Sequence, residues 1–410
     1  NGLVYLNLYF DVSDLTLEEL SAATFLMELL GKLPTAKYTS AQLQMLTKQK
    51  IGKLHFDESV YDGKKLSVQL NAQMVCLANQ KENAADLLCQ ILTETRFDDI
   101  TLLKNLLNQT MMHQQMVFAG AGHRFASIRA AAMVTGAGAA VEALYGSTFI
   151  QWVKAHCADD DAALQTLAEQ LKALANKAFA AKRMTVGISN NAQALAETVI
   201  AAFPAGEAAA AANFAPMAVT QVGLPIPAPI GFAAKASNIK NHGGSFTGST
   251  YVLANILRFS YLWNEIRVQG GAYGCGFSGT PNGDMYFHTY RDPQPGRSLE
   301  VFDKAAEFIR NFCAETEDLT PMILGAFSAA DPLLNTQRQI ATAETRYFTG
   351  TTYEDSCRIS RELVQTTKED LLALTEALEQ IAKDNAVCVV AGQPLLDACG
   401  EKLVQIQQVL

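Results

Sequence analysis

The chain has 410 residues, 49% of them hydrophobic and 18% charged, which is the composition of a folded protein with a sizeable core. Its 32 Lys and Arg against 41 Asp and Glu give a net charge of -9, without the basic clusters that nucleic-acid binding requires. No apolar run of about 18 residues occurs, so we expect no membrane-spanning segment, and the length predicts two or three domains.

The first half of the chain is predicted to begin with an alternating strand at 3–10. Asp14 is a plausible N-cap for the amphipathic helix that follows, with Glu18 and Glu19 close behind it. An Asp62-Gly63 turn joins two strands into a hairpin. The other predicted elements are helices at 40–49, 82–95, 100–118, 124–134, 161–180 and 193–203, and a strand at 183–189.

The Ala- and Pro-rich segment 204–229 is predicted to be a partly extended linker, because its five prolines disfavour a continuous helix. The second half restarts with a strand near 231–236 and a long helix at 249–268. A hairpin then turns at Asn282-Gly283. The remaining predicted elements are helices at 298–312, 321–334, 336–348, 353–364 and 368–383, a strand at 386–390, and a helix from 395.

The order strand, helix, hairpin, helices, strand, helix occurs twice along the chain. This repetition predicts an α+β fold with two homologous domains, each an antiparallel sheet packed with helices. The predicted boundaries are 1–205 for the first domain, 206–229 for the linker and 230–410 for the second domain. Because the chain lacks an initiator Met and opens directly on a strand, we expect it to be a piece of a longer protein.

The common metal and nucleotide motifs are missing from the sequence. The six histidines form no H-x-x-E-H cluster, and no nucleophile elbow, Walker loop or dinucleotide fingerprint occurs. His55 and Glu58 are a near miss, but a strand would direct them to opposite faces, so we reject them as a metal site. The eight cysteines include no C-x-x-C pair and are predicted to be reduced and mostly buried.

The most informative segment is 261–276, which reads YLWNEIRVQGGAYGCG. It is predicted to be the end of a helix that stops at Gly270-Gly271 and continues into a strand. Arg267 and Tyr273 would then direct two hydrogen-bond donors to one place, which suits a peptide carbonyl or an oxyanion. A structural alternative stays open, since a late-turn Arg favours the helix dipole and a strand Tyr is ordinary core material. By residue types alone, that alternative is favoured.

The same segment, with Tyr290-Arg291-Asp292-Pro293 after it, resembles the C-terminal half of presequence-protease-type peptidases. These belong to the pitrilysin and insulinase clan of zinc peptidases. The resemblance implies two similar halves that close around an unfolded peptide, each half containing two homologous α+β domains. Further matches are GHRFA at 122–126 with Arg129-Ala130, Arg346-Tyr347, and TTKEDL at 366–371.

In that family the zinc motif lies in the first domain of the N-terminal half, and this chain resembles the other half. Thr24 and Glu28 stand at the positions of the two His ligands and Met27 at the position of the catalytic Glu, and they cannot replace them. The resemblance therefore implies that this chain alone holds no metal and is inactive. Its partners would be the N-terminal half of the same protein, which holds the zinc, and an unfolded peptide substrate, with no nucleic acid and no membrane.

The resemblance also implies a role for the segment at the double glycine. Arg267 and Tyr273 would reach across the closed chamber to the substrate carbonyl next to the scissile bond. There they would stabilise the oxyanion while zinc-bound water attacks from the other half. Gly270, Gly271 and Gly274 are the predicted substrate-binding residues beside them.

Two alternatives remain at this point. The chain could be a separately encoded, non-catalytic subunit of a two-subunit peptidase. It could also be a structural core-type subunit without a peptidase role, although the Arg267 and Tyr273 pair argues against this. The acidic balance would suit basic peptides. The expected compartment is the cytoplasm for a bacterial protein and the mitochondrial matrix for a eukaryotic one.

Overall fold

The computed structural model describes residues 2–189 and 192–410. The described residues do not include Asn1, where the first predicted domain begins, or residues 190 and 191 inside that domain. The chain forms two compact units, which are described separately below. Unit 1 comprises Asn1–Gln114, Ala143–Phe214 and Asn335–Thr349, and unit 2 comprises Gln115–Glu142, Ala215–Leu334 and Gly350–Leu410. The contiguous domain boundaries given above divide the chain by its order of elements, and they stay a prediction.

Unit 1 contains an antiparallel sheet whose strand order is β2-β3-β1-β4. Alternate side chains of β1, such as Val4, Leu6 and Leu8, are fully buried, which is the period of two expected for a strand with one face on the core. The strands are β1 (Leu3–Asp11), β2 (Lys53–Asp62), β3 (Leu66–Leu77) and β4 (Met184–Ile188).

Most helices from the first half of the chain belong to unit 1, and the others belong to unit 2. The first helix begins after Thr16, whose hydroxyl accepts from the backbone of Glu19 in a capping box. The predicted N-cap Asp14 was wrong, because its carboxylate instead accepts two hydrogen bonds from Arg183. The helices are α1 (Leu17–Leu29), α2 (Ser40–Lys50), α3 (Lys81–Glu94), α4 (Ile100–Gly120), α5 (Gly122–Ala132), α6 (Gly136–Tyr145), α7 (Ser147–Cys157), α8 (Asp161–Ala178) and α9 (Leu195–Ala201).

The sheet of unit 2 has the strand order β10-β5-β9-β6-β8-β7. It is mixed and not purely antiparallel, because β5 pairs in parallel with both β9 and β10. Strand β5 lies within the segment that was predicted to be a linker. The strands are β5 (Gln221–Pro225), β6 (Gly231–Asn238), β7 (Gly274–Gly279), β8 (Asp284–Tyr290), β9 (Ala386–Ala391) and β10 (Gln405–Ile406).

The two sheets share one topology. Within unit 2 the order β7-β8-β6-β9 repeats the unit 1 order β2-β3-β1-β4 strand for strand. The three pairings of the repeat are antiparallel in both units. The α+β fold with a duplicated arrangement, predicted from the order of elements, is thereby confirmed, and β5 and β10 are additions beyond the repeat.

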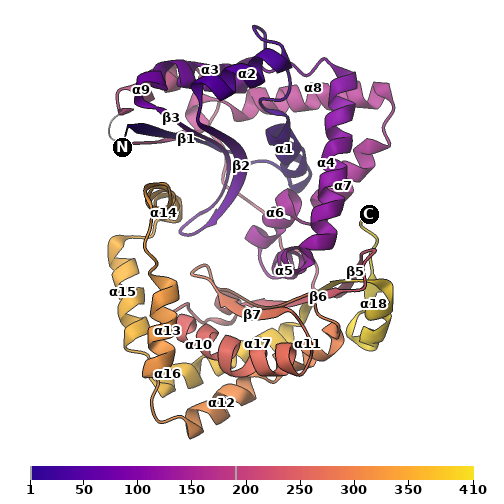
Figure 1. Cartoon of the computed structure of the whole chain (residues 1–410), viewed down its shortest axis with the longest axis vertical. Helices are drawn as coiled ribbons and strands as arrows, with labels where there is room; N and C mark the ends of the chain where they lie inside the picture. Colours follow the sequence, from indigo (N-terminus) through magenta and orange to yellow (C-terminus); the bar gives the residue numbers. More distant parts are fainter. Residues whose placement is uncertain (1, 190–191) are drawn as a thin grey trace. The chain divides into compact units, whose positions relative to one another are not determined.

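Strands β6 and β9 are buried along their whole length, so both faces of the unit 2 sheet are covered at its centre. Helices α10, α11 and α17 lie along one face (Figure 1). The helices of the second half are α10 (Ser249–Ile256), η5 (Leu257–Val268), α11 (Pro295–Asp303), α12 (Ala305–Glu315), α13 (Thr320–Ala330), α14 (Thr336–Thr349), α15 (Tyr353–Val364), α16 (Lys368–Ala373), α17 (Thr375–Asp384) and α18 (Gln393–Cys399). No described helix is both long and apolar enough to cross a membrane.

Helix α5 covers the other face of the unit 2 sheet, where it packs on β6, β8 and β9 (Figure 1). Its first residue, Gly122, lies so close to the ring of Phe232 that an added Cβ would stand 2.3 Å from a ring carbon. Arg129 on the same helix is buried, with its guanidinium 3.3 Å from the Glu142 carboxylate and 2.9 Å from the amide oxygen of Gln407. A helix from the first half of the sequence is therefore part of the unit 2 core.

Unit 1 contains a helix from the second half in the same way. The Glu344 carboxylate of α14 accepts hydrogen bonds from Asn7 at 2.8 Å and from the Tyr9 hydroxyl at 2.6 Å. Asn7 and Tyr9 alternate with the buried core residues of β1, so α14 lies on the face of the sheet opposite the core helices. Phe348 of α14 adds an edge contact with the Tyr9 ring.

The close packing of α5 leads to a stability prediction. Gly122→Ala should lower the free energy of unfolding by about 1–3 kcal/mol, because the new methyl group must displace the Phe232 ring in a packed core. The matched control is Gly120→Ala at the end of α4, where an added Cβ meets nothing within 4 Å. Chemical denaturation of both variants measures the difference. Equal stabilities would contradict the packing of α5 on β6.

Candidate functional site

The predicted long helix after β6 follows two different helical geometries. Ser249–Ile256 is an α-helix, and Leu257–Val268 continues as a π-helix, η5, with i→i+5 hydrogen bonds. A π-helix of this length is rare, and π geometry occurs preferentially at functional sites. The sequence pattern indicated a helix but carried no signal for its hydrogen-bond register.

The double glycine ends η5 as predicted. Gly271 has φ +79°, which is the left-handed region that favours glycine, and its N–H donates to the Arg267 carbonyl at 3.1 Å. Ala272 donates to the Ile266 carbonyl at 3.1 Å. A Cβ on Gly270 would stand 2.5 Å from that same carbonyl oxygen. Both glycines are therefore needed for the chain to turn from η5 into β7.

This turn brings Arg267 and Tyr273 together. The central carbon of the Arg267 guanidinium lies 5.5 Å from the centre of the Tyr273 ring and 4.2 Å from the centre of the Trp263 ring. Tyr273 is 66% exposed, so its phenol faces solvent and is not core material. Among the described residues, no hydrogen bond or ion pair involves the Arg267 guanidinium. The pair has unused donors on an open surface.

Strand β7 presents small residues beside the aromatic side chains of β8. Gly276 pairs with His288, and a Cβ on Gly276 would stand 2.7 Å from the imidazole. Gly274 pairs with Tyr290 and has only ordinary contact distance to it, at 3.5 Å. The space over Gly276 is therefore occupied by the His288 side chain, whereas Gly274 has more room beside Tyr290.

Two histidines meet on this face of the unit 2 sheet. His123 at the start of α5 has its ring centre 6.4 Å from that of His288 and 4.9 Å from that of Tyr290. Burial, with smaller electrostatic contributions from His123 and Arg258, lowers the pKa of His288 to about 4. Burial also lowers the pKa of His123. Both imidazoles are therefore neutral at pH 7.

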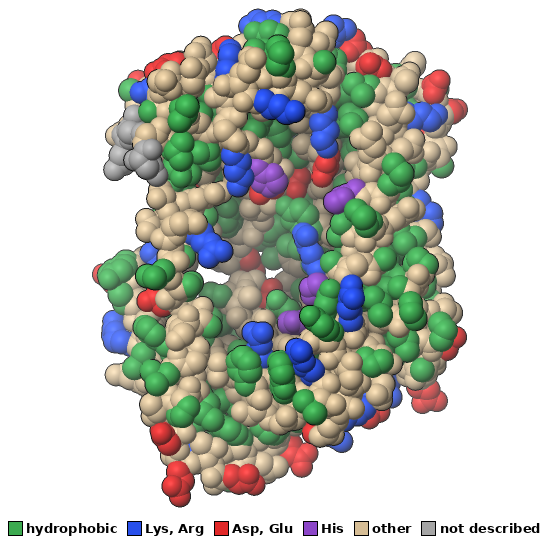
Figure 2. Space-filling view, in the orientation of Figure 1, with side chains coloured by type: hydrophobic (Ala, Val, Ile, Leu, Met, Phe, Trp, Pro, Cys, Tyr) green, Lys and Arg blue, Asp and Glu red, His purple; other side chains and the backbone are tan. Residues whose placement is uncertain are grey.

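This cluster was not predicted from the sequence, because α5 and β8 are far apart in the chain and the GHRFA match at 122–126 gives no indication that His123 lies near His288. Figure 2 shows histidine side chains beside Lys and Arg side chains in the region of α5 and β7. Tyr290 links the cluster to the site, since its ring meets that of Tyr273 edge to face at 5.9 Å.

Asp292, which follows β8 and belongs to the matched motif, has a structural task. Its carboxylate accepts from the Ser298 hydroxyl at 2.6 Å and from the Gln294 backbone at 2.8 Å. Its own backbone exchanges two hydrogen bonds with Gly231. Asp292 thereby fixes the start of α11 against the sheet.

The positions that resemble degenerate zinc ligands lie on α1 and have separate contacts. The Thr24 hydroxyl donates to the Leu20 carbonyl, Met27 is buried in the core, and Glu28 pairs with Lys32 at 3.0 Å. In the described part of the chain, no group of three or more His, Cys, Asp or Glu side chains could hold a metal ion.

His55 and Glu58 leave β2 on opposite sides. The His55 side chain is 55% exposed and lies 3.4 Å from the Asp57 carboxylate, whereas Glu58 is buried. Burial raises the pKa of Glu58 to about 8, with a smaller increase from the negative charge of Asp57. Glu58 is therefore a protonated core residue at neutral pH.

The raised pKa of Glu58 predicts a pH dependence of stability. Its folded pKa lies above the unfolded value, so its contribution is complete below about pH 4.5 and is lost as the pH rises through about 8. Relative to Glu58→Gln, the wild type should lose up to about 5 kcal/mol between those conditions. Urea denaturation across this pH range measures the change, with Glu18→Gln as the exposed control. Parallel pH profiles for the wild type and Glu58→Gln would refute a buried titrating carboxyl.

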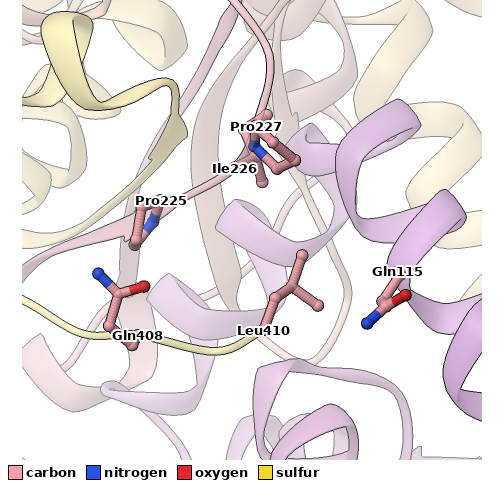
Figure 3. Close-up of a pocket in the computed structure, with 6 residues that line it drawn as sticks. All are labelled: Gln115, Pro225, Ile226, Pro227, Gln408 and Leu410. Atoms are coloured by element: carbon pink, nitrogen blue, oxygen red, sulfur yellow. The ribbon is translucent and has the colours of Figure 1, made fainter.

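A cavity of about 470 Å³ lies elsewhere in unit 2. It is lined by residues from α4, from the end of β5 and the segment after it, and from the C-terminal end of the chain (Figure 3). None of these residues belongs to the segment 257–276. The lining residues are Gln115, Pro225, Ile226, Pro227, Gln408 and Leu410. No charged side chain is among them, so this cavity does not compete with the Arg267 and Tyr273 surface as the chemical site.

Comparisons with known families divide the chain into two matched parts. A model for the domain associated with subfamily C of the M16 peptidases matches residues 1–155, and one described as "PreP C-terminal domain" matches residues 222–393. Protein HypA of Clostridium perfringens is 23% identical over 96% of this chain and 41% of that protein. Presequence protease 1 of Arabidopsis thaliana, named as chloroplastic/mitochondrial, is 23% identical over 98% of this chain and 38% of that protein. The chain thus spans less than half the length of these relatives.

Solved structures agree with this assignment at the level of the fold. The inactive domain of a peptidase M16 from Pseudomonas fluorescens superposes with a TM-score of 0.66 and 17% identity, covering 95% of this chain and 92% of that one. The periplasmic protease PqqL of Escherichia coli gives a TM-score of 0.58 and 14% identity, covering 96% of this chain and 43% of that one.

Proposed function

This chain belongs to the M16 peptidases, as the C-terminal half of a presequence-protease-type enzyme, and we propose that it supplies the wall that binds the substrate carbonyl in a peptide-degrading chamber. The observation that carries the proposal is the Arg267 guanidinium, which lies beside the exposed phenol of Tyr273 and has no carboxylate partner among the described residues. The substrate class is unfolded peptide.

The chemistry of the pair supports this role. A peptide carbonyl oxygen gains negative charge as its carbon becomes tetrahedral, and donors aimed at it bind that state more tightly than the neutral carbonyl. The Arg267 guanidinium is always charged and presents several N–H donors, and the Tyr273 hydroxyl adds another. Neither side chain needs to change its protonation state to do this.

The proposed partner is the N-terminal half of the same protein. In this proposal the zinc ion of the family is held by that half, and this chain alone hydrolyses nothing; no group of three or more possible metal ligands occurs among the described residues. A separately encoded subunit is the second arrangement of the same chemistry. A structural core-type subunit is not favoured, because it would have no use for an accessible Arg267 and Tyr273 pair.

The glycines and the compartment are part of the proposal. Gly271 is exposed at the turn, where its backbone can contact a peptide, whereas Gly270 is buried and shapes the turn. Gly274 would let a peptide approach β7 beside Tyr273.

From relatives named as mitochondrial or chloroplastic, we propose the mitochondrial matrix for a eukaryotic source and the cytoplasm for a bacterial one.

Arg267→Ala and Tyr273→Phe in the complete peptidase should each lower kcat by about a hundred- to thousandfold, the usual effect of losing one oxyanion donor. Folding should be unaffected, since surface side chains without polar partners contribute only about 0.5 kcal/mol. Hydrolysis of a short internally quenched fluorogenic peptide measures kcat, and thermal melting checks folding.

The control is Arg258→Ala, which removes an exposed arginine from the same π-helix. It should leave hydrolysis unchanged. Normal turnover by both Arg267→Ala and Tyr273→Phe would reject the proposed function.

A further inference from the structure

The Arg267 side chain is held by aromatic rings and not by an acid. Its guanidinium carbon lies 4.2 Å from the centre of the Trp263 ring, one helical turn earlier on η5, and 5.5 Å from the centre of the Tyr273 ring. Arg297 and Arg310, in the same unit, instead pair with the carboxylates of Glu265 and Glu379. Arg267 thus has a different kind of support from these neighbours.

This difference matters for a cation that must bind a carbonyl oxygen. A carboxylate partner would occupy two N–H donors and neutralise much of the charge. A ring face attracts the flat guanidinium through its quadrupole, while the N–H groups point outward in the plane of the cation and remain available. Ring stacking therefore orients the guanidinium and leaves its charge and donors unused.

Trp263 has no evident task in the core. It is 39% exposed, whereas its neighbours Tyr261, Leu262 and Ile266 on the same helix are buried. Its ring is therefore only partly covered, so packing in the core does not fully account for it. The contact that distinguishes it is the one with Arg267.

We propose that Trp263 is a positioning residue, which holds the Arg267 guanidinium over the start of β7 with its N–H donors free for a peptide carbonyl. The inference rests on the proposed function of Arg267 and adds a residue that acts only through it. Trp263 itself touches no reacting atom. Loss of the Trp263 ring should therefore lower kcat, because the Arg267 guanidinium would be held less firmly near the substrate carbonyl. It should have a smaller effect on substrate affinity.

The test compares three variants of the complete peptidase with a short internally quenched fluorogenic peptide. Trp263→Leu should lower kcat by about two- to fivefold, the effect of losing one exposed cation–π contact, with a smaller change in KM. Trp263→Phe keeps a ring face and should restore most of the loss. Phe259→Leu is the matched control, because it removes an exposed ring of the same helix that lies under Arg258 and not under Arg267.

A double variant separates this inference from the proposed function. If Trp263 acts through Arg267, Trp263→Leu should have no further effect on kcat in an Arg267→Ala background. Independent, multiplying effects would overturn the positioning role while leaving the proposed function intact. A normal kcat for Arg267→Ala would reject the positioning role, and normal kcat values for both Arg267→Ala and Tyr273→Phe would reject the proposed function itself.

A second readout does not depend on activity. The 410-residue chain has two tryptophans, so Trp152→Phe in this chain by itself leaves Trp263 as its one indole. In that background, Arg267→Ala should raise the quenching of Trp263 fluorescence by acrylamide, because the guanidinium no longer covers one ring face. Unchanged quenching would show that the stack does not form in solution and would overturn the inference.

Discussion

The candidate site depends on the burial of the central strands of unit 2 on both faces. Strands β6 and β9 are buried along their whole length, so a sheet covered on one side would expose half of their side chains to water. Helices of the second half cover one face, and α5 from the first half covers the other. Helix α5 packs on β6, β8 and β9, and Tyr273, just before edge strand β7, remains 66% exposed beside Arg267 at the end of η5.

The surroundings of Arg267 keep its positive charge unopposed. Nearby acids are engaged elsewhere: Glu265 pairs with Arg297, and Asp292 is buried with its own donors. The two histidines are neutral because burial lowers their pKa values. An arginine in such a setting suits an oxygen that becomes negative only during a reaction, and this is the physical basis of the proposed function.

The duplicated topology gives the two units different tasks. In unit 1, helix α1 follows β1 just as α10 and η5 follow β6 in unit 2. The α1 side chains at the positions of a zinc motif make ordinary helix and surface contacts, whereas the end of η5 presents the Arg267 and Tyr273 pair. One fold thus supports a scaffold in one copy and a candidate binding surface in the other.

The sequence by itself determined the α+β class, the duplication, the glycine turn after Arg267 and the family, because strand periodicity, turn residues and motif spacing are local properties. It misplaced the first N-cap and missed helices α6 and α7. It also gave no indication of strand β5, because this short Pro-rich stretch becomes a strand through its pairing with β9. The tertiary structure alone decided three features: the π-helical register of η5, the proximity of the His123 and His288 rings, and the stacking of Arg267 on Trp263. The physical reason is that packing joins side chains from distant segments and leaves no trace in the local pattern.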